Sequence, residues 1–148
     1  MFRGSSTHKM DQKGRLSIPA RFKKEIGLKD DKVLFITAMD HCIKAYSKSK
    51  WIEIETELNA QKKRNKNMRR FFRLFVGKAA ECKIDKHGRI IIPQNLREYA
   101  AIEKEVELIG VLDHFEIWSP KLLALENEEL EKDLNLEEFQ NEIAELGL

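Results

Sequence analysis

A nine-residue motif occurs twice in the chain, and this duplication constrains the fold more than any other feature of the sequence. The first copy spans residues 11–19 and reads DQKGRLSIP, and the second spans residues 85–93 and reads DKHGRIIIP. Aspartate, glycine, arginine, isoleucine and proline recur at the same offsets in both copies. Because such repetition marks a repeated supersecondary unit, the chain is predicted to contain two copies of one small unit.

The similarity between the two halves continues beyond the motif. Residues 33–41 read VLFITAMDH, which resembles VELIGVLDH at residues 106–114. Each unit is expected to hold a few short strands, one short helix after the motif proline, and a β-hairpin. One such unit cannot bury both faces of its hairpin. Two copies are therefore predicted to pair about a pseudo-two-fold axis and to close into a barrel.

The predicted fold class is α+β, with a β-barrel formed by two internal repeats and with flanking helices. The first repeat is placed at residues 5–47, and the second at residues 77–119. Connecting helices with a basic segment are placed at residues 48–76, and an acidic helical tail at residues 120–148. A hydrophobic content of 42% in 148 residues is sufficient for the core of one domain.

Local signals predict where several helices begin and end. Gly27 is expected to end the helix after the first motif, and Pro120 to begin another. Ser47 or Ser49 is expected to cap the helix that follows the first hairpin. Asn135, with a glutamate three residues later, is expected to cap the last helix.

The arginine of each motif copy can be interpreted as a nucleic-acid contact. Arg15 and Arg89 carry a planar fork of donors that matches phosphate oxygens or the edge of guanine. Lys13 and Lys86 belong to the same turns, and the first turn is expected to lie near Arg3. The predicted DNA-binding residues are Arg3, Lys13, Arg15, Lys86 and Arg89.

The aspartates and glycines of the two turns are interpreted as structural. Asp11 and Asp85 can pair with the arginine of their own turn or of the opposite repeat, and we favour this bracing role over acid–base chemistry. Gly14 and Gly88 permit a positive φ and a close approach of the backbone. The arginines could brace the domain, bind a partner, or divide these roles between the two copies.

The charges are unevenly distributed although the formal net charge is only +2. Every charged residue between Lys62 and Arg73 is basic, whereas Lys132 is the only cation from Glu126 to the end of the sequence. The basic stretch could follow nucleic-acid phosphates or form a solvated helix face, and its phenylalanines are expected to point inward. The tail could pack as helices or clasp a basic partner, and its apolar stripe favours packing.

The sequence contains no recognisable catalytic or metal-binding pattern. It has no P-loop, no G-x-S-x-G elbow and no dinucleotide fingerprint. The histidines lack the spacing of metal ligands; they are His8, His41, His87 and His114. We therefore predict a protein that is not an enzyme, with no catalytic residues, no metal, no cofactor and no small-molecule substrate.

The remaining features predict a cytoplasmic protein. Cys42 and Cys82 are isolated and lack CxxC spacing, so they are expected to be reduced and buried. No apolar run has the length of a membrane span, and the first residues show no targeting pattern. No membrane partner is expected.

Taken together, the motifs resemble those of the MraZ family of bacterial proteins. The matching stretches are MFRG at residues 1–4, D-x-KGRLSIP at 11–19, G-x-A-x-EC at 77–82, D-x-x-GRI-x-IP at 85–93 and FEIW at 115–118. The resemblance covers nearly the whole chain, to about residue 120. It implies a duplicated AbrB-like barrel of the swapped-hairpin type, a fold also found in MazE-type antitoxins.

The resemblance also implies a function. Proteins of this family are transcriptional regulators, often repressors, that bind short direct repeats of double-stranded DNA upstream of the division and cell-wall gene cluster. Ring-shaped homo-oligomers and association with the nucleoid are implied as well. The DNA-contacting turn of the family corresponds to Lys13 and Arg15 here. The second turn, with Lys86 and Arg89, carries His87, and its contact with DNA stays open.

An alternative interpretation is an antitoxin-like interaction module whose acidic tail clasps a basic protein partner. The resemblance argues against it, because such antitoxins usually supply one repeat per chain and this chain supplies two.

Overall fold

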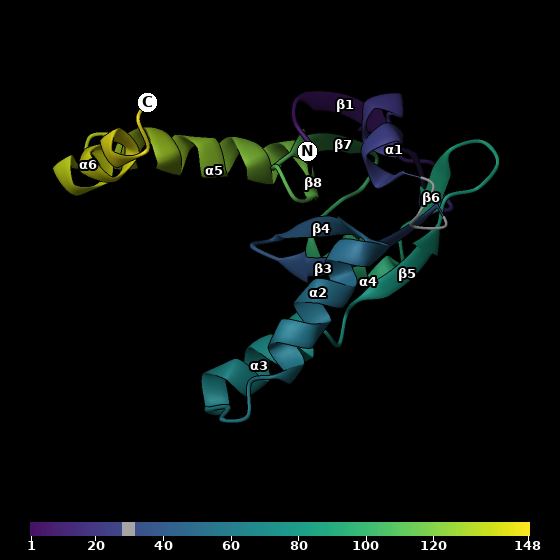
Figure 1. The fold of residues 1–148 in the computed structure, drawn as a ribbon. Coiled ribbons are helices and arrows are strands. Elements are labelled where there is room, and N and C mark those ends of the chain that lie inside the picture. Colours follow the sequence, from purple (N-terminus) through teal and green to yellow (C-terminus); the bar gives the residue numbers. More distant parts are fainter. Residues whose placement is uncertain (28–31) are drawn as a thin grey trace.

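The computed structural model describes residues 1–27 and 32–148, which form a six-stranded antiparallel sheet, a two-stranded ribbon and six helices (Figure 1). The strands are β1 (Ser5–Lys9), β2 (Arg15–Ser17), β3 (Val33–Met39), β4 (Cys42–Ser47), β5 (Ala80–Lys83), β6 (Arg89–Ile91), β7 (Glu105–Gly110) and β8 (Phe115–Trp118). The helices are α1 (Ala20–Ile26), α2 (Lys48–Asn59), α3 (Lys66–Phe75), α4 (Gln94–Tyr99), α5 (Pro120–Asp133) and α6 (Glu137–Glu145). Residues 28–31 of the predicted first repeat lie outside the described residues.

The first strand of each repeat pairs with the other repeat. β1 is hydrogen-bonded to β7, with Ser5 opposite Ile109, and β5 is hydrogen-bonded to β3, with Lys83 opposite Val33. The main sheet therefore has the order β1-β7-β8-β4-β3-β5, while β2 pairs with β6 separately. Reversing this order exchanges every strand with its counterpart in the other repeat, so a pseudo-two-fold axis passes between β4 and β8.

The predicted closure into one barrel is wrong for the described part of the chain, although the α+β class is confirmed. β1 and β5 form the two edges of the main sheet, and β2 and β6 make up a sheet of their own. The reason lies in the two motif turns. Each turn redirects the chain after β1 or β5 into the ribbon, so the edge strands are not joined to each other.

Both repeats contribute to one hydrophobic core between the ribbon, the main sheet and the short helices. Leu16 and Ile90, at the centre of the ribbon, are at most 1% exposed. Phe22 of α1 stacks on Phe115 of β8 with ring centroids 4.7 Å apart, and Phe2 packs against both rings. Aromatic pairs of this kind add to the stabilisation from burial. The ribbon is thus anchored through its inner face.

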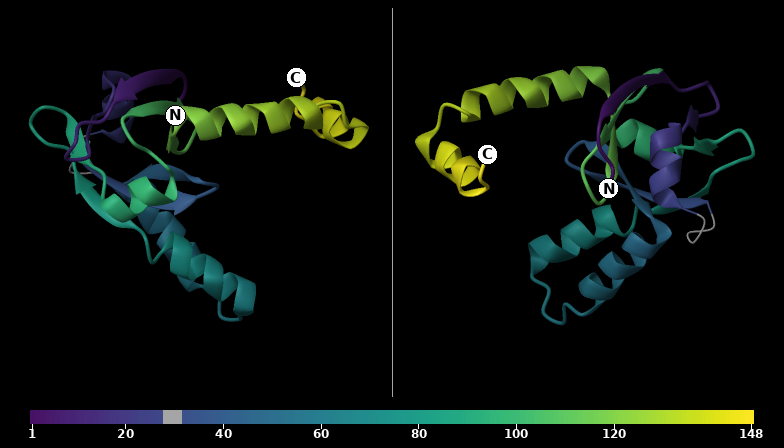
Figure 2. Two further views of the ribbon diagram at one scale, coloured as in Figure 1. Left: turned by 180° about the vertical axis from the view of Figure 1, so that it is seen from behind. Right: turned by 45° about the horizontal axis from the view of Figure 1, so that its top comes forward.

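Two helical extensions project from this core, as Figures 1 and 2 show. The hairpin of α2 and α3 has a small cluster of its own, in which Trp51 stacks on Phe75 with centroids 5.5 Å apart. The Thr37 hydroxyl of β3 donates to the carbonyl oxygen of Phe75 and ties the hairpin to the sheet. α5 and α6 extend in another direction, and all their residues are at least partly exposed. In the described ranges, no helix combines the length and the apolar character needed to cross a membrane.

Several predicted helix limits are confirmed. The N–H of Gly27 closes α1, and Pro120 opens α5. Ser47, rather than Ser49, caps α2, and its Oγ accepts a hydrogen bond from the N–H of Lys50 at 3.3 Å.

The predicted cap at Asn135 is wrong. Its Nδ2 donates to the carbonyl oxygen of Glu131 at 3.3 Å, so the side chain serves the end of α5. The residue at the start of α6 is Leu136, which supplies no side-chain cap.

Both cysteines are free and buried, as predicted. Burial raises the pKa of the Cys82 thiol to about 11 and also raises the pKa of Cys42. Both thiols are therefore protonated at neutral pH and behave as small apolar residues.

Candidate nucleic-acid interface

The first motif turn is held together by its aspartate. Asp11 Oδ1 accepts hydrogen bonds from the backbone N–H groups of Lys13 and Arg15, both at 2.9 Å. Asp11 Oδ2 accepts a further bond from Arg15 Nε at 2.5 Å. The chain reverses at Gly14, where φ is 82°. The N–H donors, above all that of Arg15, hold the pKa of Asp11 below its ordinary value, so the carboxylate stays charged.

The second motif turn repeats this geometry. Asp85 Oδ1 accepts from the N–H groups of His87 and Arg89 at 2.8 and 3.0 Å. Asp85 Oδ2 accepts from Arg89 Nε at 3.1 Å, and φ of Gly88 is 77°. The same donors, led by Arg89, lower the pKa of Asp85. Each aspartate therefore braces its own turn.

Each turn is also hydrogen-bonded to the other repeat. The N–H of Ile92 donates to the carbonyl oxygen of Gly14 at 2.8 Å, and the N–H of Ile18 donates to that of Gly88 at 2.9 Å. The short β2–β6 ladder lies between these bonds. Because the ladder is antiparallel, the two turns lie at its opposite ends.

The outer face of the ribbon presents both motif arginines. Arg15 lies opposite Ile91, and Ser17 lies opposite Arg89. Paired residues and alternate residues of a strand share a face, so these four side chains point the same way. Ile91 is 60% exposed, which identifies this face as the one turned to solvent. The diagonal placement puts the two arginines roughly 7–8 Å apart, with their Cβ atoms somewhat closer.

Pairing with aspartate engages only part of each guanidinium group. The ion pairs of Arg15 and Arg89 run through Nε, and the side chains remain 33% and 30% exposed. The two terminal nitrogens of each group carry donors in a fixed orientation that suits a planar acceptor. One arginine can therefore brace its turn and bind a partner at the same time.

Comparison with known proteins decides the family. A family model described as "MraZ protein, putative antitoxin-like" matches residues 1–74 and matches again at residues 75–142. The chain belongs to the MraZ family. The resemblance found in the motifs is thereby confirmed, and the two successive matches confirm the internal repeat.

Curated MraZ relatives resemble the chain over most or all of its length. The "Transcriptional regulator MraZ" of Desulfosudis oleivorans is 45% identical over 148 residues, which cover 100% of both chains. The protein of the same name from Desulforapulum autotrophicum is 44% identical over 148 residues, again with 100% of both chains. That of Halothermothrix orenii is 46% identical over 121 residues, or 82% of each chain.

In this MraZ-family chain, the exposed lysines of the two turns flank the ribbon, but Arg3 does not lie with them. Lys13 and Lys86 are exposed on their turns. Arg3 precedes β1 (Ser5–Lys9), whereas the first turn follows that strand. An antiparallel strand rises about 3.4 Å per residue, so Arg3 lies roughly 20 Å or more from the turn along the chain direction. The expected proximity of Arg3 to the first turn is therefore wrong.

The basic stretch forms a surface separate from the ribbon. Figure 1 shows α3 and β6 at distant ends of the molecule. Two of the three phenylalanines of α3 pack inward as predicted, because Phe75 is buried and Phe71 stacks on it at 5.3 Å, whereas Phe72 lies outside this cluster. Arg64 lies over the ring of Phe72 at 4.2 Å. The aromatic side chains of this MraZ-family helix therefore support the hairpin.

Two cations that the sequence motif did not reveal pack across the turns. Arg97 Nε donates to the carbonyl oxygen of Ile92 at 3.0 Å, and Arg97 Cζ lies 3.1 Å from the point that a Cβ on Gly14 would occupy. Lys23 Nζ lies 2.5 Å from the equivalent point on Gly88. Each cation is the fourth residue after its motif proline, and this equal spacing is the signal that could have identified them.

Within residues 1–27 and 32–148, no group of three or more His, Cys, Asp or Glu side chains could hold a metal ion.

Proposed function

We propose that the chain is a sequence-specific transcriptional regulator that binds double-stranded DNA through the outer face of the β2–β6 ribbon. The observation that carries this proposal is the shared face of Arg15 and Arg89, each braced by an aspartate. A two-stranded ribbon has dimensions that the major groove admits, and arginine donors match O6 and N7 of guanine. The names of the relatives, transcriptional regulators, support the same function.

The proposed roles follow from position on the ribbon. Arg15 and Arg89 read base edges, while Lys13 and Lys86 contact phosphates on either side. Asp11 and Asp85 hold the turns, together with Gly14 and Gly88, whose φ angles are positive. Arg3 has no proposed contact on this surface.

The finer parts of the proposal extend the family resemblance. The regulator binds short direct repeats in the promoter of the division and cell-wall gene cluster and represses it. The exchange of first strands between repeats supports a duplicated AbrB-like domain. We further propose a cytoplasmic, nucleoid-associated protein that assembles as a ring.

The test is a footprint on the promoter of this gene cluster, combined with a salt titration on that DNA and on random DNA of equal length. Each neutralised phosphate is expected to add about −0.9 to the slope of log K against log salt. Protection of short repeats with a steep slope supports the proposal. A flat slope, or equal affinity for random DNA, contradicts sequence-specific binding.

One observation keeps an antitoxin-like role as a second candidate. α5 and α6 carry many exposed acidic side chains on helices that project from the core (Figure 2). Co-purification of a basic protein partner that is lost when residues 120–148 are removed, with DNA binding unchanged, would favour this candidate.

A further inference from the structure

The α2–α3 hairpin carries a long run of positive charge. Between Glu57 and Glu81 the sequence holds eight lysine and arginine residues and no acidic residue. None of the ion pairs found among residues 1–27 and 32–148 involves one of these eight cations. Because they have no carboxylate partner within the described part of the chain, they can meet the acidic groups of another molecule.

An exposed apolar row runs beside these cations on α3. Met68 and Phe72 are four residues apart, and Val76, which is 40% exposed, continues the row at the end of the helix. Met68 and Phe72 directly precede Arg69 and Arg73, so the cations form a second row about 100° further round the helix. Phe72 and Val76 also line a surface groove of about 510 Å³ between α2 and α3. The hairpin therefore offers an apolar groove with positive charge along one side.

Among the described residues that line this groove, two are charged, and both are held within the hairpin. Arg64 Cζ lies 4.2 Å from the centre of the Phe72 ring, and Arg64 Nε donates to the carbonyl oxygen of Gln61 at 3.0 Å. The carboxylate of Glu55 accepts a hydrogen bond from the indole N–H of Trp51 at 2.5 Å. Arg64 thus adds to the positive side of the groove, while Glu55 is already engaged.

The last helix of the tail has the complementary pattern. Three of its glutamates lie on one face at intervals of four and three residues: Glu138, Glu142 and Glu145. Each directly precedes an apolar residue, and these form a second row: Phe139, Ile143 and Leu146. No residue of α6 is buried, and Leu146 is 73% exposed. The tail therefore presents an apolar row with negative charge along one side.

The order of charged and apolar residues is opposite in the two helices. In α3 a cation follows the apolar residue, as in Phe72-Arg73, whereas in α6 a carboxylate precedes it, as in Glu142-Ile143. Successive residues of any α-helix are about 100° apart around its axis. Two such helices that pack in parallel through their apolar rows therefore bring the cations and the carboxylates to the same side of the contact.

The two surfaces of one chain do not meet. Figures 1 and 2 show the free end of the α2–α3 hairpin and α6 projecting from the core in different directions, apart from each other in every view. Every copy of the chain carries both surfaces, so a second copy supplies the helix that fits the groove. DNA phosphates would satisfy the cations of α3 but would leave its apolar row unused.

We propose that α6 of one copy docks in the groove of the α2–α3 hairpin of a neighbouring copy. The apolar row of α6 covers Phe72 and Val76, as an amphipathic helix does in an apolar groove. The glutamates of α6 pair with Lys66, Arg69 and Arg73. The charges select this pairing, because they oppose contacts between two hairpins or two tails.

This contact joins different surfaces on successive subunits. It is therefore head-to-tail, and it closes into a ring when the rotation between subunits allows. It deepens the proposed ring and rests on that assembly, but it does not depend on DNA binding.

Light scattering after gel filtration of the full chain tests the contact by charge reversal. One variant reverses the hairpin, Lys66→Glu/Arg69→Glu/Arg73→Glu, and one reverses the tail, Glu138→Lys/Glu142→Lys/Glu145→Lys. Each variant alone should assemble only at a concentration about tenfold higher or more, because like charges replace three attractive pairs. An equimolar mixture should assemble at the concentration of the unaltered protein. In the mixture the reversed hairpin meets the reversed tail, and the unaltered tail meets the unaltered hairpin.

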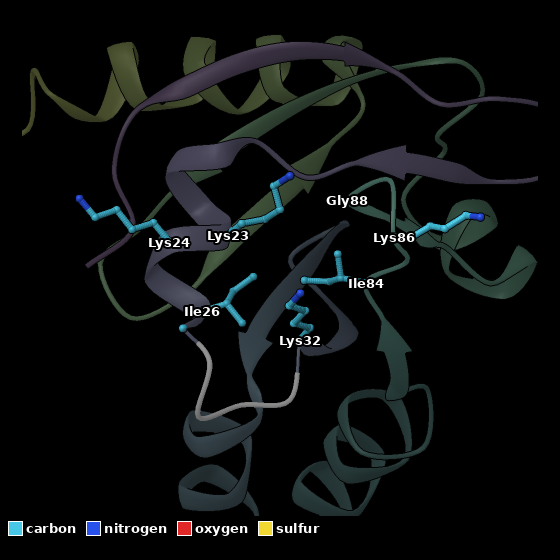
Figure 3. Close-up of a pocket in the computed structure, with 8 residues that line it drawn as sticks. Lys23, Lys24, Ile26, Lys32, Ile84, Lys86 and Gly88 are labelled. Atoms are coloured by element: carbon cyan, nitrogen blue, oxygen red, sulfur yellow. The ribbon is translucent and has the colours of Figure 1, made fainter.

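The matched control reverses three lysines outside both surfaces. Figure 3 shows Lys24 extending outward from α1, and Lys83 and Lys104 are exposed on other segments. Lys24→Glu/Lys83→Glu/Lys104→Glu changes the net charge as much as the hairpin variant does, and it should assemble within about twofold of the unaltered concentration. Circular dichroism shows whether each variant keeps its helices. Where a triple variant is unfolded, Arg73→Glu and Glu142→Lys serve in the same mixing test.

The outcomes separate the contact from the proposed function. Unchanged assembly of both folded variants, or an equal loss in the control, overturns the contact and leaves the ring standing. Failure of the mixture to assemble also overturns the contact. If the unaltered protein is a monomer at every concentration, the contact and the ring are both wrong, while the footprint still tests DNA binding. If the hairpin variant keeps its assembly and loses only DNA affinity, the hairpin belongs to a DNA surface and the contact is wrong.

Discussion

The backbone N–H of Ile18 donates to the carbonyl oxygen of Gly88 at 2.9 Å, so a strand end of the first repeat completes the turn of the second. The reciprocal bond joins Ile92 to Gly14 at 2.8 Å. Together with the exchange of β1 and β5, these bonds make each repeat dependent on the other for its backbone partners. The ribbon that carries the two arginines exists only when both repeats are folded.

Replacing the two turn glycines is expected to destabilise the protein unequally. Both have positive φ, which costs an alanine roughly 1–2 kcal/mol. A Cβ at position 14 would also lie 2.9 Å from the carbonyl oxygen of Ile92, which is fixed backbone, whereas at position 88 it meets the flexible end of Lys23. Gly14→Ala should therefore lower the free energy of unfolding by about 1 kcal/mol more than Gly88→Ala. Urea unfolding of both variants measures the difference, and equal losses would contradict it.

Arg15→Ala is expected to weaken specific DNA binding more than Arg89→Ala. Both turns carry one lysine and one arginine, so the expected order rests on the family resemblance, which assigns the DNA-contacting turn to Lys13 and Arg15. Loss of a good bidentate base contact costs about 1–3 kcal/mol. Titrations on promoter and random DNA test this order.

Asp11→Asn is the control for the arginine variants. It retains an acceptor for the backbone N–H groups while removing the charge that holds Arg15 Nε. A smaller loss of DNA affinity than in Arg15→Ala is expected. An unfolded Arg15→Ala protein would instead assign Arg15 a structural role.

Stability is expected to fall through His114 as the pH rises above 6.5. Burial lowers the pKa of this imidazole, but hydrogen bonds to Glu116 and Asp113 outweigh it and raise the pKa above 6.5. The charged form is thus favoured by folding, so its stabilisation is complete below 6.5 and disappears as the pH rises through the folded-state pKa. At acidic pH the unaltered protein should have a higher free energy of unfolding than His114→Gln. This difference should shrink as the pH rises above 6.5. Parallel curves for the two proteins would exclude this contribution.

The proposed ring is expected to make DNA binding depend on repeat number. Exposed apolar side chains such as Leu125 and Leu130 offer contacts to a neighbouring subunit, and head-to-tail contacts give rings when the rotation closes. Successive ribbons on in-phase repeats can raise affinity by about 10²–10⁴. Light scattering should show many subunits per particle, and half-turn insertions between repeats should abolish the gain. A monomer that ignores repeat phasing would refute the mechanism.

The sequence predicted the duplication, the turns and most helix limits, because each depends on residues close together in the chain. The pairing of β1 with β7 was not predictable in detail, since a five-residue alternating strand such as Ser5–Lys9 does not specify its partner. The predicted closed barrel was wrong for the same reason, because the pairing of the edge strands is not specified by their local sequence. The predicted cap at Asn135 was wrong because the Asn135 side chain instead donates a hydrogen bond to the carbonyl oxygen of Glu131.

The candidate site was predictable only where one motif carries it. Arg15 and Arg89 were found from the repeated turn, but their common face follows from the register of the ladder.

The pairing of Ser5 with Ile109 also sets the order of events during synthesis. The amino-terminal strand leaves the ribosome about 100 residues before its partner, an interval of roughly 5–20 s at common translation rates. Throughout that interval, β1 presents an unpaired edge in a crowded cytosol. All five residues of β1 are polar, so its unpaired edge offers little apolar surface for premature association with another chain.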